Sequence, residues 1–217
     1  MNGRATVLAG FALAAGAAAW AWNSGSSAHL SAARGTAVAS ISQPPHAPEG
    51  RLYLTKAQLD QALATGTLDR PVKSLLDVPA PIHFGDYAWN EAAVPAGATW
   101  IRIDLRSQLI SVFRAGHEIG TAVIVYGGDN KETPVGKLHI LAKARDHRSS
   151  VYDAEMPYTL RLTNDGVSIH ASSVRWGAAT HGCIGVPLGF AERLFNASRI
   201  GDEVEIVGQG AASNRSS

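Results

Sequence analysis

From Thr99 onward, apolar side chains recur at every second position, and this alternation constrains the fold more than any other pattern in the chain. Ile101, Ile103 and Leu105 alternate with charged residues. A period of two places one set of side chains on a single face of a β-strand. Similar segments lie at 109–114, 118–126, 137–144, 158–162, 167–170 and 203–207. Turn-forming residues separate many of them, so the sequence predicts a mainly β domain that opens with an antiparallel meander.

Two short helices are expected beside the strands. Residues 188–197 follow Pro187, which suits the first turn of a helix, and they carry apolar residues on one face. A second helical pattern lies within residues 52–68, where Thr55 can act as the N-cap. The predicted fold class is therefore mainly β: a β-sandwich, flattened barrel or mixed sheet with one or two short helices.

The N-terminus differs from the rest of the chain. The run from Thr6 to Trp22 contains no charged residue and follows Arg4. Such a run is typical of a signal peptide or an N-terminal membrane anchor, and its length is compatible with either. We therefore expect the protein to be exported to the periplasm or cell envelope. The N-terminal segment would either be cleaved or hold the protein at the inner membrane.

Composition divides the remainder of the chain. Residues 23–50 are rich in Ser, Ala, Gly and Pro. A segment of this composition cannot bury enough apolar surface to fold alone, so it predicts a tether. The expected segments are 1–22 as signal peptide or anchor, 23–50 as flexible linker, 51–98 as a short helix with an irregular packing arm, 99–208 as the main β domain and 209–217 as a disordered tail.

The charge of the chain limits its partners. The formal net charge is +1, and only 17% of the residues are charged. Nucleic-acid binding requires clustered Lys and Arg, and no such cluster occurs, so a nucleic acid is not an expected partner. The sequence gives no indication of the oligomeric state.

The only cysteine in the 217 residues is Cys183, which has no intrachain disulfide partner. It lies between Gly182 and Ile184, shortly after Thr180 and His181. Gly182 permits a sharp turn, and backbone N–H groups near the cysteine can face a developing oxyanion. A helix beginning near Pro187 would favour the thiolate.

Two histidines compete as the base for this thiol. His170 ends a predicted strand and would approach from a neighbouring element, whereas His181 is two residues from Cys183 and would lie beside it. We expect His170 to be the base, oriented by a backbone carbonyl, and His181 to brace the loop. The alternatives are an inert buried cysteine and a zinc site built from these three residues. The zinc site lacks both a fourth ligand and a known motif, so no metal and no cofactor is predicted.

Several segments together resemble the L,D-transpeptidase family, the YkuD-type catalytic domain. The resemblance covers about residues 99–207. It rests on Asp104-Leu105-Arg106-Ser107-Gln108, Thr133-Pro134-Val135-Gly136, Met156-Pro157-Tyr158, Gly166-Val167-Ser168-Ile169-His170 and Thr180-His181-Gly182-Cys183-Ile184.

The resemblance implies a YkuD-type β-sandwich that acts on the stem peptides of peptidoglycan. It implies that Cys183 attacks the peptide bond and forms a thioester, that His170 is the general base, and that Thr180, His181 and Gly182 support the oxyanion site. The acceptor implied is an amine, from a stem peptide, a lipoprotein or a D-amino acid. The alternatives are an L,D-carboxypeptidase or endopeptidase that uses water, and a non-catalytic wall-binding module.

Two features depart from the family pattern. Gly185 stands where many members carry Arg or Asn, and the spacer between His170 and Cys183 is short. The short spacer predicts a trimmed lid and easier access for water. The residues expected to line the substrate groove are Tyr152, Tyr158, Arg175 and Trp176.

Overall fold

Strands dominate the computed structural model, which describes residues 50–208 except 79, 129–130 and 150–152. All described residues fall in one compact unit. The strands are β1 (Arg51–Leu52), β2 (Leu75–Leu76), β3 (Tyr87–Trp89), β4 (Thr99–Asp104), β5 (Leu109–Arg114), β6 (His117–Val123), β7 (Gly136–His139), β8 (Ala142–Ala144), β9 (Thr159–Arg161), β10 (Ser168–Ala171), β11 (Ile184–Val186) and β12 (Glu203–Val207). The helices are α1 (Lys56–Ala64) and α2 (Leu188–Ala197). The prediction of a mainly β fold with two short helices is confirmed.

The larger sheet has the strand order β3-β6-β5-β4-β12-β7. Strands β4, β5 and β6 form the expected antiparallel meander. The closing strand β12 then lies parallel to β4. The sheet is therefore mixed. Strand β3 extends it at the β6 edge, although the sequence predicted an irregular arm for this segment.

The smaller sheet has the strand order β11-β10-β9-β8. Its central pair, β10 and β11, is parallel. Two hydrogen bonds between the backbones of Val125 and Gly185 join the end of β6 to β11. These bonds tie the smaller sheet to the larger one beside Cys183.

Residues 137–144 were predicted to form one strand, and this prediction is wrong. The segment divides into β7, in the larger sheet, and β8, in the smaller one. At the crossing, the N–H of Ile140 bonds to the carbonyl of Asp202, while that of Leu141 bonds to the carbonyl of Arg161. The alternation continues through a change of sheet, so periodicity alone does not reveal the break.

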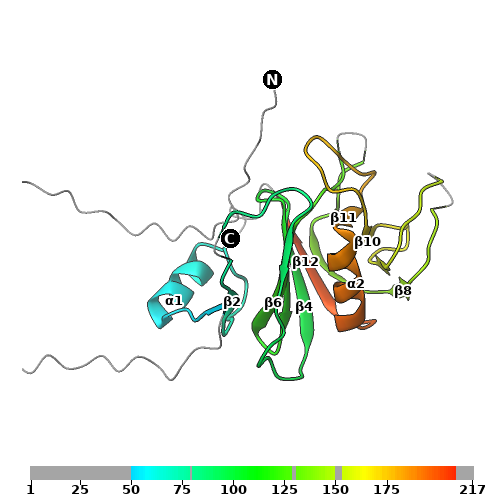
Figure 1. The fold of residues 1–217 in the computed structure, drawn as a ribbon. Coiled ribbons are helices and arrows are strands. Elements are labelled where there is room, and N and C mark those ends of the chain that lie inside the picture. The colour runs from blue at the N-terminus through cyan, green and yellow to red at the C-terminus, as the bar shows by residue number, and fades with distance from the viewer. Residues whose placement is uncertain (1–49, 79, 129–130, 150–152, 209–217) are drawn as a thin grey trace, which may run out of the picture. The chain divides into compact units, whose positions relative to one another are not determined.

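The main core lies between the two sheets and includes one face of α2. Phe190, Ala191 and Leu194 of this helix are buried among side chains from both sheets. The helix packs against β10, β9 and β6 (Figure 1). Its bounds coincide with the predicted 188–197, and α2 supports the strand that carries His170.

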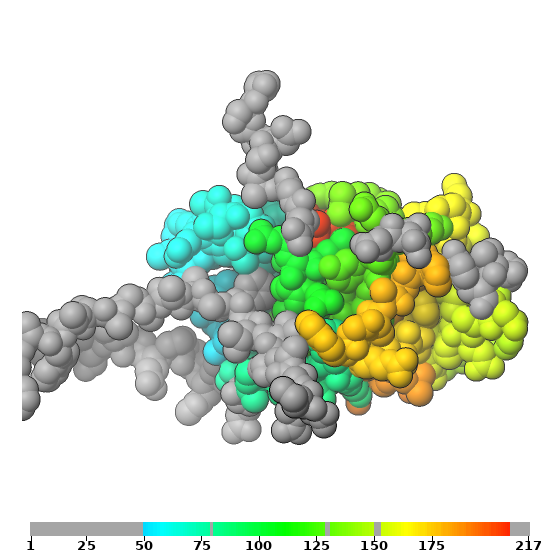
Figure 2. All heavy atoms as spheres, turned by 90° about the horizontal axis from the view of Figure 1, so that it is seen from above, coloured from blue at the N-terminus to red at the C-terminus, as the bar shows by residue number. Residues whose placement is uncertain are grey.

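A second core covers the outer face of the larger sheet. Trp100 and Phe113 stack there, with ring centroids 4.2 Å apart. Leu59 and Leu63 of α1 pack against this cluster, and Thr55 caps the helix as predicted. The segment that contains α1 lies on one side of the β4–β6 strands, with α2 and the smaller sheet on the other (Figures 1 and 2).

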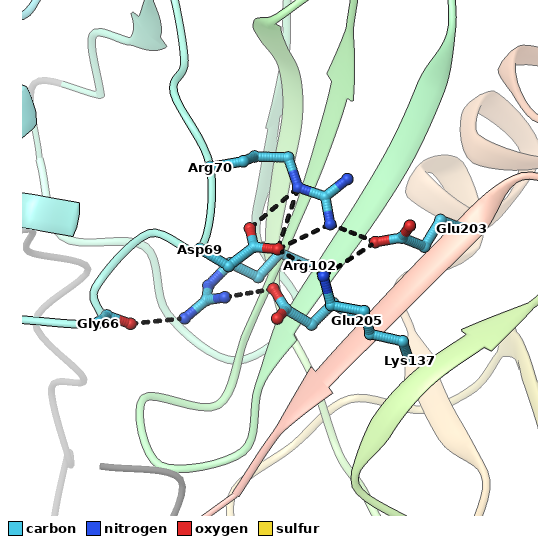
Figure 3. A network of polar contacts seen from close by, with 7 residues as sticks. All are labelled: Gly66, Asp69, Arg70, Arg102, Lys137, Glu203 and Glu205. Carbon is cyan, nitrogen blue, oxygen red and sulfur yellow. Dashed lines mark hydrogen bonds and ion pairs between the residues drawn. The ribbon is translucent and has the colours of Figure 1, made fainter. Parts of the chain in front are cut away.

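The charged positions of β4 are therefore not all exposed. Arg102 is 7% exposed, because the loop after α1 covers it. It forms an ion pair with Glu205 of β12 at 2.5 Å and donates to the carbonyl of Gly66 at 3.2 Å (Figure 3). The alternation of apolar and charged residues along β4 therefore does not mark a solvated face, because this sheet is covered on both faces here.

A second set of charges lies beside this pair. Arg70 contacts both Asp69 and Glu203, and Lys137 reaches Asp69 at 3.1 Å (Figure 3). Burial alone would raise the pKa of Asp69, but hydrogen bonds from Arg70 and Lys137 outweigh burial and lower the pKa to about 2. The network joins the loop at 66–70 to β7 and β12.

The first strand of the described region is also fixed to the larger sheet. The guanidinium group of Arg51 donates two hydrogen bonds of 2.7 Å to the carbonyl of Glu118. The buried carboxyl of Glu118 accepts from the N–H of Leu76 at 2.9 Å, and burial raises its pKa. Residues 51–98 thus contact the sheet through both apolar and polar groups.

The predicted signal peptide or anchor, nearly all of the predicted linker and the predicted tail lie outside the described residues. Within the part of the chain that the structure describes, no helix is long and apolar enough to span a membrane.

Candidate active site

Cys183 lies immediately before β11, the strand that pairs in parallel with β10. In this pairing Ile169 is opposite Ile184, and His170 is opposite Gly185. Extending the register by one residue places Cys183 level with Ser168. Since alternate residues share a face of a strand, the Cys183 side chain is expected on the face that carries His170.

The imidazole of His170 is held by its own strand. Its Nδ1 lies 2.8 Å from the carbonyl oxygen of Ala171, and the residue is 9% exposed. A carbonyl oxygen can only accept, so Nδ1 carries the proton in this contact, and Nε2 of the neutral ring keeps its lone pair. The orienting group is a backbone carbonyl, as the sequence predicted.

The thiol of Cys183 is half-buried, and its Sγ lies 3.8 Å from the carbonyl oxygen of Gly166. Burial raises the pKa of the Cys183 thiol, while the backbone N–H of Ser168 and the charge of Lys131 act in the opposite direction. Burial is the largest of these effects. The thiol is therefore protonated at neutral pH.

The expectation that a helix start would favour the thiolate is wrong. The helix α2 begins at Leu188, and the whole of β11 separates it from Cys183. The effect of a helix dipole falls off within about one turn, so it does not offset burial at this distance.

The pKa of His170 is lowered. Burial is the main cause, the hydrogen bond to Ala171 partly opposes it, and the charge of His147 adds to it. At neutral pH the imidazole of His170 and the thiol of Cys183 are therefore both neutral. Such a pair suits general-base catalysis, in which the proton leaves sulfur as the attack begins.

Hydrogen bonds to carbonyl groups fix the loop that precedes β11. The hydroxyl of Thr180 donates to the carbonyl of Cys183 at 2.5 Å, and that of Thr133 donates to the carbonyl of Gly182 at 3.1 Å. Gly182 has φ = +95°, a conformation that favours glycine. These contacts give the predicted loop residues Thr180 and Gly182 clear structural roles.

The other predicted residues lie in different settings. His181 is exposed. Arg175 and Trp176 are also exposed, and Trp176 meets Phe84 edge-on, with ring centroids 5.7 Å apart. The loop between β10 and the cysteine thus rests on residues of the 51–98 segment.

Tyr158 is half-buried and packs against Phe195 of α2, with ring centroids 5.8 Å apart, and against Arg145. These contacts place its ring beside the helix. Tyr152 lies outside the described residues. A groove role for these two residues, as for Arg175 and Trp176, stays a prediction.

Sequence reasoning missed two residues near the thiol. Thr133 belongs to the Thr-Pro-Val-Gly turn, which was recognised only as a motif. Lys131 lies near Gly182 and forms an ion pair with Asp165 at 3.5 Å. Neither position could be placed beside the cysteine from spacing alone, since about 50 residues separate them from it in the chain.

A comparison with known families identifies the domain that contains these residues. Residues 98–206 match the model of the YkuD family, described as the L,D-transpeptidase catalytic domain. The match spans half of the chain, and the chain belongs to this family. It therefore contains an enzyme domain of the L,D-transpeptidase kind.

Individual relatives carry the same name. The chain is 28% identical over 121 residues to L,D-transpeptidase 1 of Mycobacterium tuberculosis, a match that covers 48% of each chain. The chain thus spans about half the length of the curated relatives it matches.

Solved structures of proteins named L,D-transpeptidase are similar to this chain over about half of its length. An L,D-transpeptidase from Stackebrandtia nassauensis is 24% identical with a TM-score of 0.48, over 52% of this chain and 57% of that one. LdtMt1 in complex with imipenem is 26% identical with a TM-score of 0.47, over 51% and 59%.

Proposed function

We propose that the protein is an exported L,D-transpeptidase that acts on peptidoglycan stem peptides through a thioester on Cys183. The observation that supports the proposal is the parallel pairing of β10 with β11, in which His170 is opposite Gly185 and Cys183 immediately precedes β11. Membership of the family supplies the substrate class. Export agrees with the charge-free N-terminal run, because peptidoglycan lies outside the cytoplasm.

In the proposed acylation, Nε2 of His170 takes the thiol proton as Sγ of Cys183 attacks the carbonyl carbon of the donor peptide bond. The carbonyl oxygen becomes an oxyanion, which backbone N–H groups near the cysteine stabilise. The C–N bond then breaks, and the departing D-alanine amine takes the proton from His170. A thioester to the stem peptide remains on Cys183.

Deacylation reverses the roles. An acceptor amine loses a proton to Nε2 of His170 and attacks the thioester carbonyl. The C–S bond breaks, and sulfur recovers a proton from the imidazolium. The same steps with water in place of the amine would produce a free carboxylate, which is the reaction of an L,D-carboxypeptidase.

Incubation of the full chain with muropeptide tetrapeptides, with and without an added amine acceptor, tests this function. Mass spectrometry of the products distinguishes the reactions: cross-linked or amine-exchanged peptides are the expected result, whereas tripeptide alone would indicate hydrolysis. C183A is the matched control and should give no product. Binding to purified cell wall without any turnover by the wild type would contradict an enzymatic role.

A further inference from the structure

Thr133 contacts the peptide unit that joins Gly182 to Cys183, the proposed nucleophile. Its hydroxyl donates to the carbonyl oxygen of Gly182 at 3.1 Å and accepts from the N–H of Gly127 at 2.9 Å. The residue is 5% exposed. The single donor and one acceptor site of this buried hydroxyl are used, which fixes its orientation.

A trans peptide unit is planar, and its C=O and N–H groups point in opposite directions. The Gly182–Cys183 unit contains the carbonyl of Gly182 and the N–H of Cys183. Because Thr133 holds the carbonyl on one side, the N–H of Cys183 is directed to the other side. On these grounds, and resting on the proposed function, we infer that Thr133 is a positioning residue for the oxyanion site.

Neighbouring carbonyl groups are held in the same way. The carbonyl of Thr180 accepts from the N–H of Gly128 at 3.2 Å, and the carbonyl of Cys183 accepts from the hydroxyl of Thr180. The N–H groups of Gly182 and Cys183, in contrast, have no acceptor among the described residues. Donors left without a partner beside a nucleophile are what an oxyanion site requires.

Close packing makes the contact specific to this loop. A Cβ on Gly127 would lie 2.8 Å from the N of Thr133 and 2.9 Å from the Cα of Gly182. The backbone of Gly127 thus packs closely against both the segment that carries Thr133 and the cysteine loop. The hydroxyl of Thr133 bonds directly to the carbonyl of Gly182. Valine has a methyl group in place of the hydroxyl, so it could fill the same space without forming this bond.

Two reactions of Cys183 can distinguish whether Thr133 positions the oxyanion donor or only supports the loop. Acylation by a carbapenem joins Sγ to the lactam carbonyl carbon, breaks the lactam C–N bond and passes through an oxyanion. Alkylation by iodoacetamide joins Sγ to a methylene carbon, expels iodide and forms no oxyanion. Loss of the oxyanion donor should therefore slow only the first reaction.

The experiment measures both rates by intact mass at pH 8.5 for the full chain of the wild type, T133V and T133S. T133V should be acylated at least about tenfold more slowly than wild type, since removing an oxyanion donor outright costs about 100-fold or more. Its alkylation rate should stay within about twofold. T133S, which keeps the hydroxyl, should recover most of the acylation rate. If T133V does not fold, T133A provides the same comparison.

Equal slowing of both reactions in T133V would show that Thr133 only shapes the loop, and an unchanged acylation rate would show that it has no role at the site. Either result overturns the inference and leaves the proposed function intact. Wild-type protein that is alkylated on Cys183 but never acylated would instead count against the proposed function.

Discussion

Gly185 stands directly opposite His170 in the parallel pairing of β10 and β11. Its N–H and carbonyl both bond to the backbone of Val125, at 2.8 Å and 3.0 Å. A Cβ at this position would lie 2.7 Å from Cγ2 of Val125 and 2.8 Å from Cβ of Ser172. The space that a side chain would occupy two residues after the cysteine is therefore already filled.

We predict that G185A destabilises the protein, because a methyl group forces Val125 or Ser172 to move. Overpacking of this kind costs about 1–3 kcal/mol. Urea unfolding of the two proteins measures the difference in free energy of unfolding.

The control is a double-mutant cycle with V125A, which removes the nearer of the two contacts. G185A should cost less free energy in the V125A background than in wild type. Equal costs in both backgrounds would mean that the clash with Val125 does not occur.

The reactivity of Cys183 should depend on pH as a neutral thiol does. Because burial raises the pKa of the thiol, alkylation by iodoacetamide should be slow at pH 7 and should increase above about pH 8.5. Alkylation rates from pH 5 to 10, read by intact mass, test this. A high rate that persists down to pH 5 would instead reveal a thiolate paired with an imidazolium.

His170 should make the folded state less stable in mild acid. Its pKa is lowered in the folded protein, so as pH falls below about 6.5 the unfolded chain binds a proton first and gains stability. The contribution is absent above that pH and grows until pH reaches the lower pKa of the folded state.

Unfolding of wild type and H170Q by urea, at pH 7.5 and pH 5, measures this effect. Wild type should lose more stability between the two pH values than H170Q, which has no group to titrate there. The same loss in both proteins would show that His170 is not the group responsible.

The ion pair between Arg102 and Glu205 should be important for stability, because both side chains are about nine-tenths buried. Removing one partner of a buried pair leaves an uncompensated charge and typically costs about 3–5 kcal/mol. R102A should therefore lower the urea midpoint strongly.

D60A is the matched control, since it removes the exposed ion pair between Lys56 and Asp60 on α1. It should change the midpoint little, because solvent screens such pairs. Similar midpoints for R102A and wild type would mean that the network in Figure 3 does not hold the arm to the sheet.

Local patterns predicted much of the fold. The helix 188–197 was read correctly because its apolar residues recur with helical spacing, and Pro187 marks its start. The strand that ends near His170 was also found from its alternation. These features depend on neighbours in the chain, which the sequence displays directly.

Structural features that depend on residues far apart in the chain could not be predicted from local patterns. Strand β11 is only three residues long, and its central residue is Gly185, so it carries little strand signal. The burial of Arg102 depends on a loop more than 30 residues away, and the contact of Thr133 with Gly182 joins positions 49 residues apart. Such pairings follow from the tertiary fold rather than from local spacing.

The sign of the pKa shift on Cys183 was missed for a related reason. The sequence places Pro187 four residues after the cysteine, which suggested a helix close enough to favour the thiolate. In the structure β11 fills that interval, and the balance between burial and nearby N–H groups depends on packing.

Acylation of the full chain by a carbapenem at pH 7.5, followed by intact mass, tests the central claim most directly. Wild type should gain the mass of one carbapenem on Cys183, and C183A should gain none. H170Q should react at least about 100-fold more slowly, because the protonated thiol needs a general base. An adduct on C183A, or H170Q reacting at the wild-type rate, would contradict the assignment of Cys183 as nucleophile and His170 as its base.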